Sequence, residues 1–442
     1  MTMGSLDLLI IGIPIVFVAS FFVIAMVRRE LAPAVGMEGA SRWILTAAIG
    51  MGIIAFSIKL TAFAVISSIP ARAIAPALVV RPVNGSTIQR ANDGFDALDS
   101  NTYVWQALPK VAPAPVDNPT TAEKVALGRR LFFDRNLSLT GEVSCASCHD
   151  VDRGGGVDGL PTSTGIRSQK GGRNAPTVWN AAFQSVLFWD GRAKSLEEQA
   201  KGPPLNPIEM GMSSPEAVVR RVEEDSSYRQ LFDLAFNVGA EITFDRIAQA
   251  IAAYERTLIT PDTPYDRFVL GDKHALSSAQ LRGMALFQTT GCVRCHMGPN
   301  FSAASVTESG SPYRLFPANA SAYETRYRLT QDTGALPPGS ERGMWRVPSL
   351  RNVALTAPYF HNGAVSSLEE AVRVMATVQL GATLDQSPHG PRKIFWSAGD
   401  KTLAAIDRQA LSKEDVADIA EFLRALTSDR LVAAAKRQPI LK

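Results

Sequence analysis

Cys145-Ala146-Ser147-Cys148-His149 recurs as Cys292-Val293-Arg294-Cys295-His296, and these two blocks contain every cysteine in the chain. In such a block the two thiols can add to the vinyl groups of one haem, and the adjacent histidine can bind the iron from the proximal side. The pattern therefore predicts two covalently bound haem c groups. Their attachment residues are Cys145, Cys148, Cys292 and Cys295, and their proximal iron ligands are His149 and His296.

Other uses of four cysteines fit this pattern less well. A four-cysteine zinc site would need two C-x-x-C knuckles, but no histidine directly after each of them. A thioredoxin-like dithiol would explain one block and not two. Disulfides within the blocks would close loops too short to constrain the unfolded chain much. We therefore expect haem attachment.

Residues 1–73 are predicted to anchor the protein in a membrane. Residues 6–27 and 43–69 are apolar runs, each long enough to cross a hydrocarbon core of about 30 Å as a helix. Three arginines lie in the loop between them, so this loop is expected in the cytoplasm and everything after residue 70 on the outer side. The competing interpretation is a signal peptide cut after Ala71-Arg72-Ala73, and the additional span ahead of it argues against this.

Beyond the anchor, the sequence predicts a mainly α-helical chain with two cytochrome c-like haem domains. Thr120 or Thr121 indicates the start of a helix ahead of the first haem block, and Ser277 indicates one ahead of the second. The net charge of +3, with no block of like charges, argues against a nucleic-acid partner. The predicted organisation is a Pro/Ala-rich tether at 74–120, an N-terminal haem domain at 121–262, a C-terminal haem domain at 263–430 and a tail at 431–442.

An internal repeat relates the two haem domains. Trp189 occupies the position that His361 holds in the second half, so the two haem sites are expected to differ in duty. The extra residues of the second half fall at 302–340, a Ser, Gly and Pro rich stretch that predicts a long surface loop. At a constant offset of 172 residues the identities include Pro176 with Pro348, Asn180 with Asn352, Gly191 with Gly363, and Leu196-Glu197-Glu198 with Leu368-Glu369-Glu370.

The position opposite each proximal histidine decides what each haem does. A haem with a sixth protein ligand transfers electrons, whereas one with an empty position is reactive. The first half offers no histidine for this position apart from His274, which, like His389, is expected in a surface loop. Its haem is therefore a candidate for an open iron. In the second half, Met375, within a predicted helix over 368–378, and His361 compete as sixth ligand, and core packing is the alternative for Met375.

Three side chains of the first half are candidates for chemistry beside the open iron. They are Trp189, Gln199 and Glu209. Glu209 lies among apolar residues in Pro207-Ile208-Glu209-Met210-Gly211, where burial would raise its pKa towards that of a general base. Taken singly, each of the three is more often structural than catalytic.

Long motifs match a known pattern in order around both haem blocks. Residues 108–134 read LPKVAPAPVDNPTTAEKVALGRRLFFD, 173–203 read RNAPTVWNAAFQSVLFWDGRAKSLEEQAKGP, and 350–372 read LRNVALTAPYFHNGAVSSLEEAV. Through these segments the chain resembles the bacterial dihaem cytochrome c peroxidase family over residues 105–430. The resemblance does not include the membrane segment.

The resemblance implies a role for each candidate residue. It implies that Met375 is the distal ligand of the C-terminal haem, which receives electrons, and that Glu209 and Gln199 line the peroxide site of the N-terminal haem. It also implies that Trp189 lies between the haems. A calcium ion is implied at the domain interface, held by the Asn174 side chain and the carbonyl oxygens of Thr356 and Pro358.

One position departs from the family pattern. Typical members have a distal histidine on the loop before the QKGxRNAPT stretch, and this position falls on Ile166. The chain therefore cannot gate its reactive haem with that histidine. In this respect it is similar to the dihaem enzymes of methylamine utilisation, which oxidise tryptophans on a partner protein. Those enzymes use a tyrosine where this chain has Met375.

The expected function is reduction of hydrogen peroxide to water at the inner membrane of a bacterium, with the catalytic domains in the periplasm. The resemblance implies a small cytochrome c or a cupredoxin as electron donor, and the membrane spans make a quinol-linked donor conceivable. Members of this family commonly dimerise, so a homodimer is also an expectation. Two alternatives remain: a dihaem oxidase that modifies a partner protein, and a membrane-tethered electron-transfer cytochrome.

Overall fold

The computed structural model describes residues 103–152, 155–382, 384 and 410–437, together with the backbone of strands at 89–90, 394–397 and 402–405. The predicted membrane anchor at 1–73 and the predicted surface residue His389 lie outside the described residues. Within the described part, no helix is long and apolar enough to span a bilayer. This part is mainly helical, as expected, and it contains both haem blocks.

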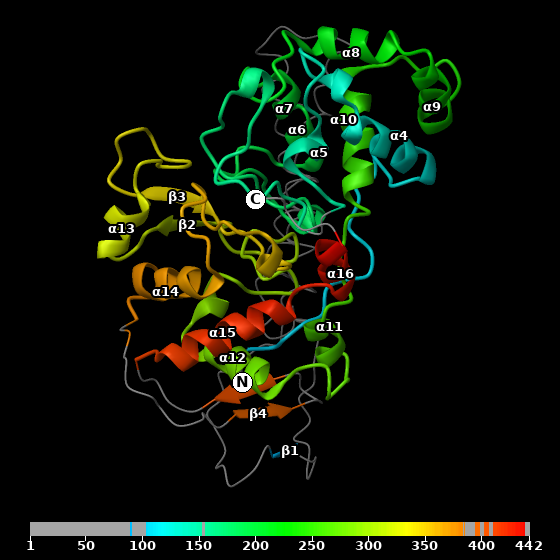
Figure 1. Ribbon diagram of the computed structural model, residues 1–442. Coiled ribbons are helices and arrows are strands. Elements are labelled where there is room, and N and C mark those ends of the chain that lie inside the picture. Colours follow the sequence, from blue (N-terminus) through cyan, green and yellow to red (C-terminus); the bar gives the residue numbers. More distant parts are fainter. Residues whose placement is uncertain are drawn as a thin grey trace, which may run out of the picture. The chain divides into compact units, whose positions relative to one another are not determined.

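The first haem domain is organised by the crossing of α4 (Ala122–Phe133) and α10 (Phe244–Glu255), which lie side by side in Figure 1. Thr121 caps α4 by accepting a hydrogen bond from the Lys124 N–H, so the helix starts where predicted. The two backbones come close because Gly128 has no side chain: a Cβ there would overlap the carbonyl oxygen of Ala250. The other helices here are α5 (Cys145–Cys148), α6 (Leu196–Ala200), α7 (Gly202–Leu205), α8 (Pro215–Glu223), α9 (Ser227–Phe236) and the 3-10 turns Arg135–Leu137, Ile166–Ser168 and Ala181–Phe183.

The second haem domain repeats this arrangement with α12 (Ser278–Thr289) and α15 (Lys413–Ala425). Ser277 caps α12 as predicted, through a capping box with Gln280. Gly283 corresponds to Gly128 of the first domain. A Cβ on Gly283 would overlap the carbonyl oxygen of Asp418, so the two helices can approach closely only with glycine there. The other elements are α11 (Pro264–Val269), α14 (Leu368–Val378), the 3-10 turns Cys292–Arg294 and Val353–Leu355, and a sheet in the order β1 (Gln89–Arg90), β4 (Ile394–Ser397), β5 (Thr402–Ala405).

The extra segment of the second domain, 302–340, differs from the loop that its composition predicts. It carries β2 (Tyr313–Phe316) and α13 (Ala322–Tyr327), and β2 pairs with β3 (Gly343–Arg346) in antiparallel register. Its start is also buried, since Ser302 is fully enclosed and bonds the carbonyl oxygen of Val347. Pairing with β3 and the buried hydrogen bond of Ser302 thus order a segment whose composition alone predicts a loop.

Both flanking segments pack into the haem domains. In the predicted tether, the fully buried Trp105 meets Tyr265, Phe301 and Phe422 of the second domain's core, edge-on or tilted. The segment predicted as a tail begins within α16 (Asp429–Arg437), whose Leu431 is buried in the core of the first domain. Apolar side chains in otherwise polar segments explain both findings, because each removes its surface from water only by docking on a domain.

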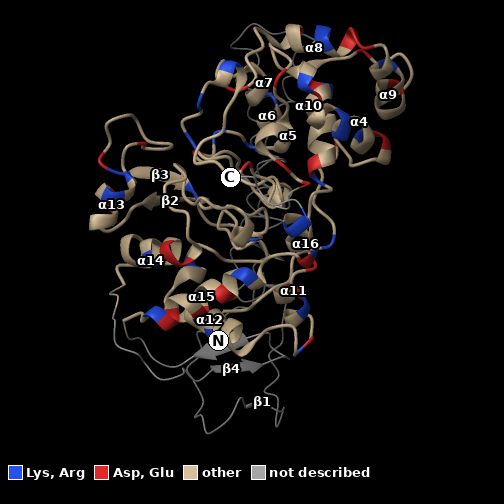
Figure 2. Cartoon of the chain, viewed as in Figure 1, with Lys and Arg blue, Asp and Glu red and all other residues tan. Residues whose placement is uncertain are grey.

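Charged residues of both signs are interspersed over the helices in Figure 2, in keeping with the net charge of +3. Within the described residues, one ion pair has both side chains fully buried. Arg351 donates to both carboxylate oxygens of Asp266 at 2.8 Å, and Asp266 also accepts from the backbone N–H of Leu108 in the docked tether. Burial opposes ionisation, but the guanidinium and these hydrogen bonds hold the pKa of Asp266 below its usual value.

One buried hydroxyl accepts hydrogen bonds from equivalent positions of both domains. Asn180 and Asn352 are equivalent in the repeat, both are fully buried, and both have left-handed backbone conformations, with φ of 63° and 60°. Their side-chain amides donate to the same oxygen, Thr260 Oγ1, at 2.8 and 3.0 Å. The backbone N–H of Asn180 bonds Leu258, and that of Asn352 bonds Leu426. The repeat therefore appears in three dimensions as two matching turns that meet at Thr260.

Replacing this hydroxyl should destabilise the junction. We expect Thr260→Val to lower the free energy of unfolding by about 2–5 kcal/mol, because two buried amide donors lose their acceptor. Thr257→Val is the matched control, since Thr257 is exposed and its hydroxyl donates to the carbonyl oxygen of Tyr254 in the preceding helix α10. Denaturant unfolding followed by circular dichroism measures both. Equal losses in the two variants would contradict a joining role for Thr260.

Candidate functional site

The two cysteine blocks adopt the same turn. The first forms α5 and the second a 3-10 turn, and each histidine's backbone N–H bonds the carbonyl of the first cysteine of its block at 2.9 Å. All four cysteines are free, so disulfides within the blocks are absent. In the described part of the chain, no group of three or more His, Cys, Asp or Glu side chains is arranged to hold a metal ion. The structural-disulfide interpretation therefore loses its support.

Both blocks open into one continuous cavity of about 620 Å³. The cavity walls are largely apolar, as a haem macrocycle requires, and they include all four cysteines, His149 and His296. The Nδ1 atom of His149 is buried and has no hydrogen-bond partner among the described residues, whereas Nδ1 of His296 lies 3.1 Å from the carbonyl oxygen of Phe301. Burial lowers the pKa of both imidazoles, that of His296 to about 4. Thiols, neutral imidazoles and an apolar enclosure together fit two covalently attached haems.

Two of the predicted catalytic side chains lie on the first domain's wall of this cavity. Gln199 is half-buried on α6, and Glu209 is half-buried in the loop that follows α7. Asn206 donates to Glu209 Oε1 at 2.8 Å and so fixes the carboxylate. Burial raises the pKa of Glu209 above its usual value, although Arg192 and the Asn206 amide oppose the shift. A carboxylate of this kind can take up a proton nearer neutral pH than a solvated one.

Ile166 does not extend into the cavity wall. It is buried, its side chain packs towards Gly211, and its backbone N–H bonds the carbonyl oxygen of Glu209 at 3.0 Å. Neighbouring Gly165 lies against the same loop, where a Cβ would overlap the carbonyl oxygen of Ile208. In typical family members this segment carries a gating histidine. Here it packs against the Glu209 loop on the side that faces away from the cavity.

In the second domain, Met375 lies on α14 and faces the cavity, and the helix has the bounds predicted for it. The competing candidate, His361, is buried and also lines the cavity, and its Nε2 has no hydrogen-bond partner among the described residues. It stacks on Trp345 with ring centroids 4.0 Å apart and meets Trp189 edge-on at 6.5 Å. His274 is exposed in a turn, as predicted.

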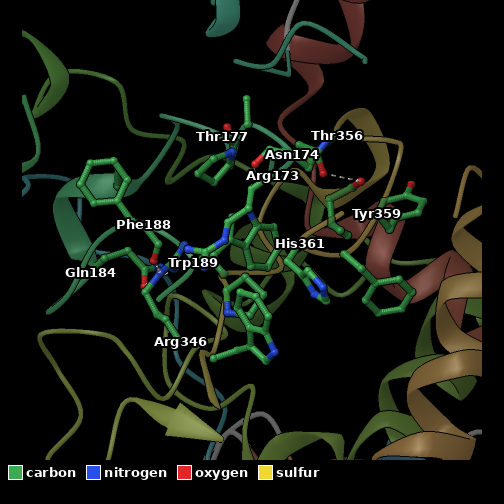
Figure 3. Close-up of a pocket in the computed structure, with 18 of the residues that line it drawn as sticks. Arg173, Asn174, Thr177, Gln184, Phe188, Trp189, Arg346, Thr356, Tyr359 and His361 are labelled. Carbon is green, nitrogen blue, oxygen red and sulfur yellow. Dashed lines mark hydrogen bonds between the residues drawn. The ribbon is translucent and has the colours of Figure 1, made fainter. Parts of the chain in front are cut away.

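Trp189 lies at the junction of the two domains. Its indole Nε1 donates to the Asn174 carbonyl at 2.8 Å, and its own carbonyl accepts from the Arg346 N–H at 2.9 Å. Figure 3 shows Trp189, Arg173 and His361 converging in one part of the cavity. Positions that are equivalent in the repeat, Trp189 and His361, are thus in contact across the junction.

The predicted calcium ligands also line the cavity. Asn174 is buried, and its Nδ2 donates to the Leu160 carbonyl at 2.9 Å, which leaves Oδ1 as the side-chain oxygen for a cation. Pro358 follows a cis peptide bond with Ala357, and Thr356 comes directly before that pair. Neutral oxygen donors of this kind suit calcium.

Several polar or aromatic residues of the cavity were not predicted from the sequence. Arg173, Arg346, Trp345 and Glu255 line it, and burial raises the pKa of Glu255 to about 8, although Arg256 opposes this. The repeat offered a signal for two of them, because Arg173 and Trp345 are themselves equivalent positions. Nothing local in the sequence distinguishes Glu255 from an exposed helical glutamate.

Comparisons with known proteins agree with this site. A family described as di-haem cytochrome c peroxidase matches residues 122–274. The cytochrome c551 peroxidase of Nitrosomonas europaea is 36% identical over 344 residues, which cover 78% of this chain and 92% of that protein. The cytochrome c551 peroxidase of Pseudomonas aeruginosa is 40% identical over 295 residues, 65% of this chain and 82% of that protein. The crystal structure of a MauG-like protein associated with microbial copper homeostasis is 31% identical, with a TM-score of 0.59 over 76% of this chain and 99% of that one.

Support of the Glu209 loop by Gly165 is testable. We expect Gly165→Ala to lower the free energy of unfolding by about 1–3 kcal/mol, because the new methyl group has no space. Gly172→Ala is the matched control, since nothing lies within 4 Å of a Cβ at that position. Thermal unfolding compares the variants, and a crystal structure would show the loop at 206–211 displaced. An unperturbed loop and unchanged stability would contradict the close packing.

Proposed function

The chain belongs to the di-haem cytochrome c peroxidase family, and we propose that it reduces hydrogen peroxide to water with electrons from a small redox protein. The observation that carries the proposal is the single cavity in which both haem-attachment blocks meet Glu209 and Gln199. The likeness to two cytochrome c551 peroxidases over most of their lengths supports it. The chain is an oxidoreductase of this type.

Two haem c groups would be held by the cysteine pairs of the two blocks, with His149 and His296 as proximal ligands. When bound, they supply the site where peroxide binds and the electron transfer that its reduction requires. A distal ligand from Met375 would close the second site, which suits electron transfer, while the first site would stay open. The position of Ile166 behind the Glu209 loop supports an open first site.

Around the open site, the protein's own groups handle protons and position peroxide. Asn206 holds Glu209 Oε1, which leaves Oε2 to accept a proton from one peroxide oxygen and return it to the other. The Gln199 amide orients the peroxide from α6. Trp189, between the domains, provides an aromatic path for the two electrons that arrive through the second site. Two protons and two electrons convert each peroxide to two waters.

A second candidate function is oxidation of residues on a partner protein, as in the methylamine-utilisation enzymes. Ile166 favours it, because that chemistry also needs an ungated first haem, and so does the likeness to a MauG-like protein. Met375 argues against it, since those enzymes have a tyrosine there. A third candidate is electron transfer alone, which would need two closed haem sites.

We also propose the finer features that the sequence predicts. These are two membrane spans within 1–73 with the haem domains in the periplasm, domain limits at 121–262 and 263–430, and a calcium ion on Asn174, Thr356 and Pro358. A homodimer is the proposed oligomeric state. Recovery of the full-length chain in the soluble fraction would argue against the anchor. If the Asn174→Ala variant still binds calcium, the proposed ion site is wrong. If analytical ultracentrifugation shows a monomer, the proposed homodimer is wrong.

Spectra and turnover of the haem-loaded protein test the three functions. Electron paramagnetic resonance of the oxidised protein should show one high-spin and one low-spin haem, whereas two low-spin signals would identify a pure electron-transfer protein. Peroxide should then oxidise a reduced small cytochrome c or cupredoxin catalytically. Absence of that turnover, with a high-spin haem present, would favour oxidation of a partner protein.

Glu209 should be essential for turnover. We expect Glu209→Gln to lower kcat by about 10²–10⁴-fold, because the amide cannot take up the proton. Wild-type activity should fall as pH decreases through the raised pKa of Glu209, since the protonated form is not a base, and the variant should lose this dependence. Glu224→Gln, an exposed change at the end of α8, is the control. Full turnover by Glu209→Gln would contradict the assignment.

A further inference from the structure

Trp345 is a buried indole at the junction that the proposed mechanism does not use. It lies on β3, is only 5% exposed, and lines the cavity. Its ring stacks on His361 with an interplanar angle of 15° and centroids 4.0 Å apart, and His361 meets Trp189 edge-on. Three aromatic rings therefore form a continuous series from the first domain's Trp189 to the second domain's β3.

The surroundings of Trp345 are shaped to hold this ring. Gly334 and Gly343 both leave space for it, because a Cβ on either would overlap nearby atoms, including the indole itself. The indole Nε1 is buried without a hydrogen-bond partner among the described residues, as is that of Trp179, whereas Nε1 of Trp105 and Nε1 of Trp189 each have an acceptor.

Arg173 controls the charge at this ring. Its guanidinium lies 5.1 Å from the ring centroid of Trp345, and a cation on an aromatic face makes removal of an electron harder. Two carboxylates offset it: Asp332 binds Nε and Nη2 at 2.6 and 3.0 Å, and Asp190 binds Nη1 at 2.6 Å. Asp190 is shared with Arg192 at 2.8 Å and also faces the buried Arg346, so two carboxylates compensate three cations near the ring. Asp332 comes from the extra segment of the second domain, which therefore sets the charge balance beside Trp345.

We propose that Trp345 is a second electron-relay residue between the two haem sites, acting with Trp189 through the ring of His361. The proposal rests on the proposed peroxidase function. Trp345 gives up one electron towards the first domain and regains one from the second, so the indole is unchanged after each passage. Two passages, with two protons, supply the reduction of one peroxide to two waters.

Rapid mixing of haem-loaded protein tests the relay. Protein with only the second haem reduced is mixed with peroxide, and the oxidation of that haem is followed by stopped-flow absorbance. We expect Trp345→Phe to slow this step about tenfold, equivalent to about 1.4 kcal/mol in activation free energy. Trp345→Tyr should restore part of the rate, because a phenol can also be oxidised. The control Trp105→Phe removes a fully buried indole outside the cavity and should leave the rate unchanged.

A second readout does not depend on turnover. Fully oxidised protein carrying ring-deuterated tryptophan is treated with one equivalent of peroxide without a donor, freeze-quenched and examined by electron paramagnetic resonance. A tryptophan radical is expected in the wild type. Trp345→Phe should remove the part of the signal that resides on Trp345, and Trp189→Phe identifies the part that resides on Trp189. Asp332→Asn, which leaves the Arg173 cation less compensated, should slow the stopped-flow step while the indole remains in place.

The outcomes separate the relay from the proposed function. Normal peroxide reduction by Trp345→Phe, with the wild-type rate and an unchanged radical signal, would overturn the relay and leave the peroxidase function standing. A wild-type protein whose second haem is not oxidised by peroxide would overturn the peroxidase function and the relay with it. Equal slowing by Trp105→Phe would assign the effect to general destabilisation and overturn the relay.

Discussion

The hydroxyl of Thr260 accepts hydrogen bonds from two equivalent asparagines, and the geometry of the site depends on this junction. Asn180 and Asn352 each hold a left-handed turn that precedes the next part of the cavity wall, and each buried amide needs an acceptor. Because one oxygen serves both, the two turns are fixed relative to each other. Thr260 Oγ1 thus satisfies both buried amide donors. The same two hydrogen bonds set the relative orientation of the two halves of the cavity.

This shared anchor explains why equivalent positions meet. Residues at equivalent positions of the repeat contact each other across the junction. Trp189 contacts His361, and Arg173 contacts Trp345. The repeat is not symmetric in chemistry, because each pair combines two different side chains. One half brings a carboxylate and an amide to the cavity, and the other brings a thioether. Two backbones related by the repeat thus form two haem sites with different chemical functions.

Much of the fold could be predicted from local signals. The caps at Thr121 and Ser277, the bounds of α14 and the repeat itself follow from residues close together in sequence. The order of the segment at 302–340 could not be predicted, because it depends on Arg173 contacting Asp332, which is 159 residues away. For the site, the sequence identified the two cysteine blocks together with Trp189, Gln199 and Glu209, all of which line the cavity. It did not identify Trp345 or Glu255, whose significance lies in their burial and in neighbours distant along the chain.

Each end of the described chain packs into the core of the domain that is farther from it in sequence. Trp105, before the first domain, completes the core of the second, whereas Leu431, after the second domain, completes the core of the first. The core around the Cys145 block is therefore complete only when α16 has docked on it, although α16 follows the second domain in sequence. Folding of the first haem domain is thereby coupled to the far end of the chain, and loss of α16 would weaken the domain that lies more than 160 residues before it.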